Sequence, residues 1–101
     1  MIYKPPIDDI VFLLKDWIGI KNINQLNGHE KLDVEDISFI LSEAGKFCSS
    51  ELLPLNSVGD QIGAKLIDGR VITPPGFKEA YQLYIESGWT GIDGNIEHGG
   101  S

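Results

Sequence analysis

Residues 32–55, LDVEDISFILSEAGKFCSSELLPL, decide the fold. Asp33, with Asp36 three residues later, is typical of a helix N-cap, and we expect a helix over residues 33–60. The apolar side chains recur at helical spacing and predict one inward stripe. It consists of Val34, Ile37, Leu41, Ala44, Cys48, Leu52 and Leu55.

Three residues inside this stretch carry further expectations. Gly45 costs about 1 kcal/mol relative to alanine in a helix interior, so we expect it to serve close packing. Pro54 removes a helical hydrogen bond and clashes with the carbonyl four residues back, which predicts a kink at that position. Cys48 is interpreted as a small core residue, because no histidine is placed by the sequence to activate it as a nucleophile.

Upstream, residues 5–20, PPIDDIVFLLKDWIGI, predict a helix over residues 6–18 that ends at Gly19. Some of its apolar residues lie off the main stripe, and the apolar surface is wide enough to contact another domain. The simpler alternative is a well-packed short helix. The inward stripe is Ile7, Ile10, Val11, Leu14 and Ile18, and the residues outside it are Phe12, Leu13 and Trp17.

A polar connector, NINQLNGHEK, follows at residues 22–31, and its Asn27–Gly28 pair predicts a turn. His29 and Glu30 have no further histidine, cysteine or carboxylate at metal-ligand spacing. We therefore interpret both as loop residues.

Downstream, residues 64–75, AKLIDGRVITPP, change to a strand-like period. Asp68–Gly69 predicts a type I′ hairpin over about residues 65–72, with Asp68 chosen for its turn geometry. A hairpin this short is marginal alone, so it has to lean on the helices or on something outside the chain.

A third helix is predicted over residues 75–87, opening at Thr73 and the following prolines. Gly88 stands where a left-handed cap residue belongs, and Trp89 can fold back on Tyr84. The expected buried face is Phe77, Ala80, Tyr81, Tyr84 and Ile85.

The fold class is therefore mainly α: a small helical domain with one short β-hairpin. The chain carries 15 acidic and 8 basic residues for a net charge of −7, and this balance argues against nucleic-acid binding. A single cysteine and the lack of a signal-like start favour a cytoplasmic protein. The apolar runs are too short for a membrane span.

No sequence motif marks a catalytic, cofactor-binding or metal site. Walker loops, dinucleotide fingerprints, paired cysteines and nucleophile elbows are missing. Asp93, Asn95 and Glu97 superficially suggest a calcium loop, but the required glycine and distal glutamate are not in register. The candidate packing or interface residues are Trp17, Tyr81, Tyr84 and Trp89.

Several quoted segments nevertheless resemble, in order and spacing, the start of an acyl-CoA dehydrogenase. They are YKPPIDDIVFLL, PLNSVGDQIGA, PPGFKEAY and GWTGI, followed by EHGG. The branch that they resemble carries an N-terminal extension and includes enzymes similar to 3-methylmercaptopropionyl-CoA dehydrogenase. On this resemblance, residues 1–30 are the extension with one helix and its connector. Residues 31–101 are the truncated start of the N-terminal helical domain.

The resemblance implies a subunit of three parts: a helical domain, a β-barrel and a helical bundle. FAD in such an enzyme takes a hydride from the β-carbon of an acyl-CoA thioester, a glutamate removes the α-proton, and electrons pass to an electron-transferring flavoprotein. The flavin-binding strands and the base lie in parts of the family that follow Ser101. No residue of this chain therefore matches them, and no cofactor is expected on the chain alone.

The expected function is that of an N-terminal segment in an oxidoreductase of fatty acid metabolism. It would pack against the rest of the subunit, the substrate cavity and neighbouring subunits, so a homo-oligomer is left open. Such a segment is not catalytically competent alone. The alternatives are a free-standing acidic helical interaction domain and a non-functional truncated gene product.

Overall fold

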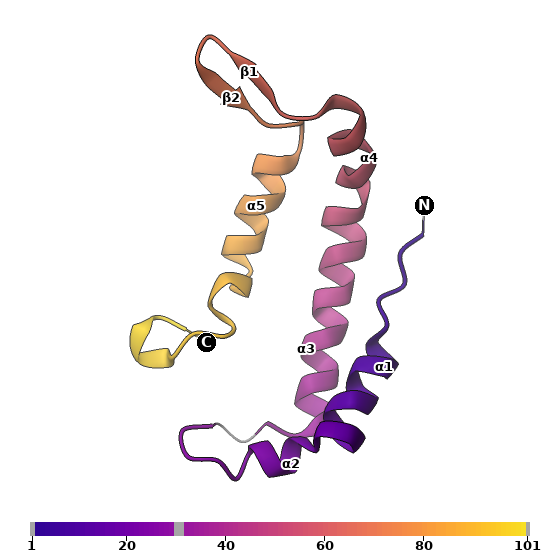
Figure 1. The fold of residues 1–101 in the computed structure, drawn as a ribbon, viewed down its shortest axis with the longest axis vertical. Coiled ribbons are helices and arrows are strands. Elements are labelled where there is room, and N and C mark those ends of the chain that lie inside the picture. Colours follow the sequence, from indigo (N-terminus) through magenta and orange to yellow (C-terminus); the bar gives the residue numbers. More distant parts are fainter. Residues whose placement is uncertain (1, 30–31, 101) are drawn as a thin grey trace. The chain divides into compact units, whose positions relative to one another are not determined.

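The structure is a computed structural model that describes residues 2–29 and 32–100. The chain divides into two compact units, Met1–Leu53 and Pro54–Ser101. Helices dominate both units, and the single sheet is a two-stranded hairpin in the second, as Figure 1 shows. The predicted fold class, mainly α with one hairpin, is confirmed.

The first helical stretch runs through α1 (Ile7–Phe12) and the π-helical segment η1 (Leu13–Ile18). The predicted span of residues 6–18 is therefore confirmed to within one residue. Gly19 ends it in a left-handed conformation with φ of 74°, as expected for a glycine stop.

A short helix α2 (Ile20–Ile23) follows, so the prediction that the connector already begins at residue 22 was wrong. The backbone amide of Asn24 donates to the carbonyl of Ile20 at 2.9 Å and closes this turn. Gly19 redirects the chain and allows a new helical turn to start, and a single turn is too short to give a periodic pattern.

The predicted turn at Asn27–Gly28 is confirmed. The amide of His29 donates to the carbonyl of Leu26 at 3.3 Å, and Gly28 has a positive φ of 82°, as the third position of a type II turn requires. Glu30 and Lys31 lie outside the described residues. The domain boundary predicted between residues 30 and 31 therefore stays a prediction.

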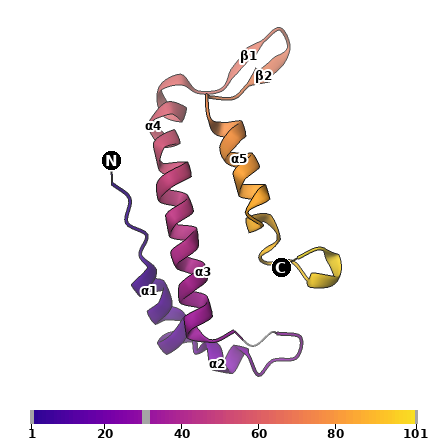
Figure 2. The ribbon, with the colours of Figure 1, turned by 180° about the vertical axis from the view of Figure 1, so that it is seen from behind.

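The long helix α3 (Val34–Phe47) begins with the predicted capping box. The amide of Asp36 donates to the Asp33 carboxylate at 2.8 Å, and the amide of Asp33 donates back to the Asp36 carboxylate at 3.2 Å. Figure 2 shows α1 running beside α3 within the first unit.

Gly45 of α3 provides the close approach that the sequence predicted. Gly45 is buried, and a Cβ atom added to it would lie 2.7 Å from Pro5 Cγ and 3.3 Å from Ile7 Cδ1. The segment that leads into α1 therefore packs directly on the α3 backbone.

The helix continues through the π-helical segment η2 (Cys48–Leu52) into α4 (Leu53–Ile62), so the predicted helix over residues 33–60 is close to the observed extent. The predicted kink at Pro54 stays a prediction, and the hydrogen-bond ladder widens in the turn before that residue. The amide of Leu53 donates to the carbonyl of Cys48, five residues back. This wider turn accommodates a ring that cannot donate and that would clash in a regular helix.

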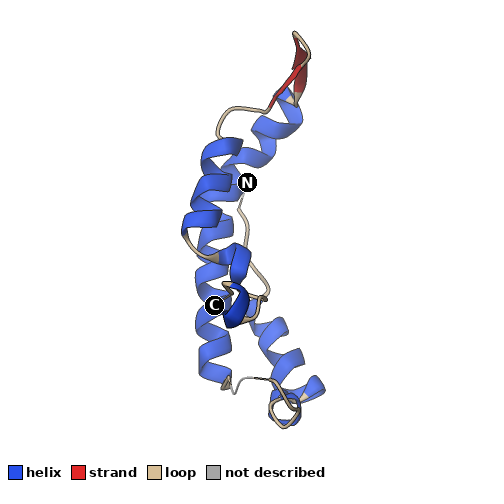
Figure 3. Ribbon diagram, turned by 90° about the vertical axis from the view of Figure 1, so that its left-hand side faces the viewer, coloured by secondary structure: helices blue, strands red, loops and turns tan. Residues whose placement is uncertain are grey.

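In the second unit, strands β1 (Lys65–Ile67) and β2 (Arg70–Ile72) form the predicted hairpin, drawn in red in Figure 3. Asp68 and Gly69 have φ values of 50° and 73°. Two consecutive positive φ angles define the type I′ turn that was predicted from Asp-Gly.

The last long helix, α5 (Phe77–Glu86), does not open at Thr73. Thr73 and Pro74 each precede a proline, which disfavours helical geometry, and Gly76 then turns the chain with φ of 86°. At the other end Gly88 has φ of 81° and donates to the carbonyl of Ile85 at 3.0 Å, which confirms the left-handed cap. The contact of Trp89 with Tyr84 stays a prediction.

The predicted buried face of α5 was largely wrong. Ala80 is only 6% exposed, whereas Tyr81 is 63% exposed, and Phe77, Tyr84 and Ile85 are also exposed. An amphipathic pattern shows which face a helix would bury but not whether a covering layer is present. Among the described residues, Phe77 is partly covered by Gly59, and Tyr81 is the most exposed of the four side chains.

The remaining residues form two short 3₁₀ segments, η3 (Trp89–Gly91) and η4 (Ile96–His98). The amide of Gly100 donates to the carbonyl of Asn95 at 3.0 Å and closes the loop around η4. Across residues 2–29 and 32–100, no helix has the length and apolarity needed to cross a membrane.

Candidate interaction surface

Exposed apolar side chains are the dominant surface feature of both units. Among the described residues, 22 large apolar side chains are exposed, while the buried residues are Gly45, Pro74 and Ala80, none of which has a large apolar side chain. Scattered exposed apolar residues are normal, but such an imbalance is typical of a protein whose binding surface is uncovered. We define the apolar surface by its most exposed members outside the first residues: Trp17, Leu26, Phe39, Leu66, Val71, Tyr81 and Ile96.

In the first unit, the most exposed member of the apolar surface lies on the π-helical segment η1. Trp17 is 78% exposed, and Phe12 and Leu13, one helical turn earlier, are exposed as well. These are the three residues that fell outside the predicted inward stripe. Their exposure supports the expectation that this helix carries a second apolar face.

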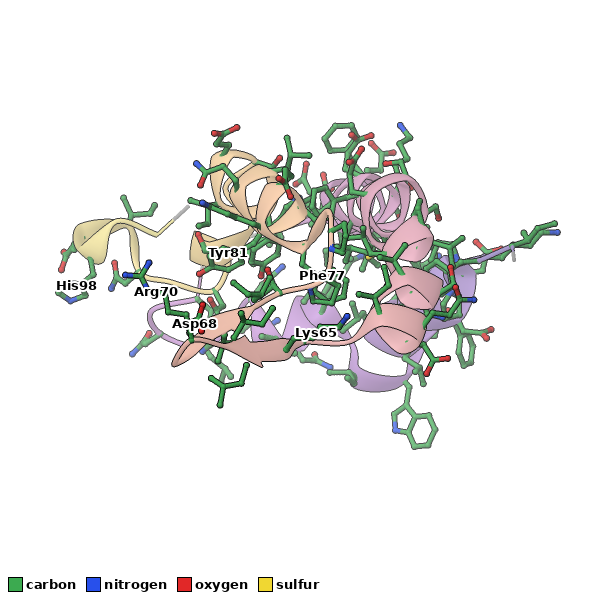
Figure 4. All side chains as sticks on the ribbon, turned by 90° about the horizontal axis from the view of Figure 1, so that it is seen from above. Lys65, Asp68, Arg70, Phe77, Tyr81 and His98 are labelled. Carbon is green, nitrogen blue, oxygen red and sulfur yellow. The ribbon has the colours of Figure 1, made fainter. Side chains whose placement is uncertain are left out.

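In the second unit, the hairpin is exposed, with one apolar face and one face on which Ile67 and Ile72 pair with Arg70 and Lys65. Leu66 pairs with Val71 on one face, and they are 73% and 69% exposed. Because strand side chains alternate, Ile67 and Ile72 lie on the opposite face. Lys65, Asp68 and Arg70 are labelled along this hairpin in Figure 4.

The other predicted interface residues lie on or after α5. Tyr81 and Tyr84 are three residues apart and therefore share one helix face. Trp89 is half-buried at the start of η3, directly after the Gly88 cap. The structure thus places Tyr81, Tyr84 and Trp89 in one unit and Trp17 in the other.

Sequence reasoning did not single out Leu66 and Val71 as interface candidates. The signal was present, because the hairpin carries apolar residues on both faces, and a two-sided apolar strand is typical of one covered on both sides. In this segment, Asp68 was instead interpreted as a residue chosen for its turn geometry.

No described group of side chains offers an evident reaction centre. Among residues 2–29 and 32–100, no polar or charged side chain is buried, and no three His, Cys, Asp or Glu side chains are grouped to hold a metal ion. The side chain of Asn95, one of the three residues that suggested a calcium loop, accepts from the amide of Glu97 at 3.0 Å and caps η4. We derive no hydride-transfer step from the described residues.

No protein-family model matches this chain. The chain is 34% identical over 100 residues to a 3-methylmercaptopropionyl-CoA dehydrogenase of Ruegeria pomeroyi. This match covers 99% of this chain and 17% of that protein. Two butyryl-CoA dehydrogenases of Syntrophomonas wolfei are 33% and 32% identical over 84 and 90 residues.

The homologues of this chain over most of its length are thus acyl-CoA dehydrogenases. The two S. wolfei proteins match 79% and 85% of this chain, and the match covers 14% and 15% of their own lengths. The chain therefore corresponds to a small segment of each relative, as the sequence resemblance implied.

Proposed function

We propose that this chain is a structural segment of an FAD-dependent acyl-CoA dehydrogenase. Its role is to pack, through the apolar surface, against the rest of the subunit and the side of the substrate cavity. The α,β-dehydrogenation of the acyl-CoA thioester is carried out by other parts of the enzyme. Acyl-CoA and an electron-transferring flavoprotein are partners of the whole enzyme in this proposal, which also places the chain in the cytoplasm.

The observation that carries this proposal is that the large apolar side chains of the chain are exposed and not buried. Twenty-two large apolar side chains are exposed, and no large side chain is fully buried in the described part of the chain. Since apolar burial contributes about 25 cal/mol per Å², leaving so much of it uncovered removes the main driving force of folding. The homologues are dehydrogenases. In this proposal, the remaining parts of such an enzyme supply the layer that covers the exposed apolar side chains.

A segment exchange tests the proposal. The matching segment of the R. pomeroyi enzyme is replaced by this chain, and the purified chimera is assayed for bound flavin and for acyl-CoA oxidation with an artificial electron acceptor. We expect a folded chimera that retains flavin and activity. A matched chimera with Trp17→Asp, Leu66→Asp and Tyr81→Asp is expected to lose both, because charged groups cannot be buried unpaired.

Two results would contradict the proposal. The first is turnover of acyl-CoA by this chain alone when it is mixed with FAD and the acceptor. The second is equal flavin content and activity in the two chimeras, since the apolar surface would then have no role in packing.

A free-standing acidic interaction domain is the second candidate function. It is favoured by the same exposed aromatic residues, Trp17 and Tyr81, which are common anchors at protein interfaces. Size-exclusion chromatography with light scattering and dye binding tests the premise that the two candidates share, which is an uncovered apolar surface. A stable monomer that binds no dye for exposed apolar surface argues against both.

A further inference from the structure

Asn27 and Gly28 lie together in the exposed turn between α2 and α3. The turn is closed by the bond from the His29 amide to the Leu26 carbonyl, at 3.3 Å. Within residues 2–29 and 32–100, no hydrogen bond engages the Asn27 side chain or the Gly28 amide. Both residues are exposed.

The space around Gly28 is open. A Cβ atom added to Gly28 would meet no atom within 4 Å, and glycine itself has no side chain to hinder approach to its backbone nitrogen. Gly28 also tolerates a wide range of backbone angles, so rotation toward the neighbouring side chain is not sterically blocked.

We infer that Asn27–Gly28 is a site of spontaneous covalent modification by succinimide formation. The Gly28 backbone nitrogen attacks Cγ of the Asn27 side chain and loses its proton to solvent base, while the side-chain nitrogen leaves as ammonia. Water then opens the five-membered ring at either carbonyl and gives aspartate or isoaspartate. The net change is water in and ammonia out, without an oxidant or a reductant.

The other asparagines of the chain are protected by features that Asn27 lacks. Asn24 donates to the carbonyl of Leu32 at 2.9 Å, and the Asn95 side chain accepts from Glu97. Asn56 lies inside α4, where the amides of the helix interior bond along the helix. Asn22 is followed by the β-branched Ile23, whose side chain hinders attack by its own nitrogen.

The modification changes the loop in a defined way. Either product adds one negative charge to a chain whose net charge is −7. Isoaspartate also routes the main chain through the former side chain and lengthens the connection between α2 and α3. The helical hydrogen bonds of α2 and α3 are left unchanged.

Incubation of the full chain at mildly alkaline pH, followed by peptide mapping with isoaspartate detection, tests the inference. We expect Asn27 to convert first among the five asparagines, giving both products. The Gly28→Ala variant is expected to convert severalfold more slowly, and Asn27→Gln to lose the product at this site. Asn22→Gln is the matched control and is expected to convert at Asn27 at the rate of the unaltered chain.

Circular dichroism before incubation verifies that each variant keeps its helical content. The inference would be overturned if another asparagine, or Asp68 beside Gly69, reacted while Asn27 was still intact. Equal rates in the Gly28→Ala variant and the unaltered chain would overturn it as well.

Discussion

Gly59 on α4 and Phe77 at the start of α5 pack directly against each other within the second unit. A Cβ atom added to Gly59 would lie 2.7 Å from Cζ of the Phe77 ring, closer than carbon atoms pack. Because glycine has no side chain, Gly59 leaves room for the aromatic ring of Phe77.

Gly59→Ala should therefore have opposite effects in two backgrounds. Alanine is favoured over glycine in a helix by about 1 kcal/mol, but overpacking against the ring costs about 1–3 kcal/mol. In the natural background we expect a net loss of stability of about 1 kcal/mol or less, because Phe77 is 37% exposed and can turn away. In a Phe77→Leu background we expect Gly59→Ala to be stabilising.

Urea unfolding of the four proteins in this double-mutant cycle measures the effect. We expect a coupling free energy of about 1 kcal/mol between the two positions. Additive effects would show that the ring does not occupy the space above Gly59. Gln61→Ala is the matched control on the same helix.

Gly45→Ala should loosen the segment that leads into α1. The new methyl group would collide with the Pro5 ring and crowd Ile7, so the segment has to move away from α3. We expect amide exchange in α1 to correspond to an opening free energy lowered by about 1–2 kcal/mol. Ser42→Ala on the same helix is expected to leave it unchanged, and equal protection in the two variants would contradict the contact.

Asp33→Ala should destabilise α3 through loss of its cap. The amide of Asp36 loses its 2.8 Å acceptor, and such substitutions cost about 0.5–2 kcal/mol. Glu35→Ala removes a charge from the same helical turn without removing a capping hydrogen bond. If the two variants lost equal helicity by circular dichroism, the helix dipole and not the cap would explain the effect.

Gly69→Ala should unfold the hairpin. Alanine at φ of 73° costs about 1–2 kcal/mol, and an isolated two-stranded hairpin is marginal. We expect the cross-strand NMR signals between Leu66 and Val71 to disappear. Asp68→Asn is expected to retain them, because asparagine tolerates the left-handed conformation; their persistence in Gly69→Ala would contradict the I′ assignment.

Trp17→Gln should reduce the binding of a fluorescent dye specific for exposed apolar surface. Trp17 is 78% exposed, so its replacement is expected to change the stability of the free chain by no more than about 0.5 kcal/mol. Lys15→Gln, on the same π-helical segment, is the control. Unchanged dye binding in Trp17→Gln would show that this side chain is not part of an exposed apolar surface that binds the dye.

Local chemistry made most of the elements predictable. The capping box at Asp33, the stop at Gly19, the I′ turn at Asp68–Gly69 and the cap at Gly88 each depend on one or two residues and their immediate backbone. Each was predicted, and each is present. The resemblance to acyl-CoA dehydrogenases was also carried by short segments and is supported by homologues over most of the chain.

The errors arose where the outcome depends on neighbours. Helical periodicity predicted that Phe77, Tyr81, Tyr84 and Ile85 are buried, but the described residues cover them only in part. The helix start was predicted at Thr73 because the prolines suit a first turn, whereas the positive φ of Gly76 delays it to Phe77.

By itself, the sequence determined the cap at Asp33, the helix stops at Gly19 and Gly88 and the hairpin turn at Asp68–Gly69, because these depend on steric and hydrogen-bonding preferences within a few residues. Tertiary structure decided that Pro5 and Ile7 meet Gly45 and that Phe77 meets Gly59. It also decided how much apolar surface stays exposed. These features depend on atoms distant in the chain, whose proximity no local preference encodes.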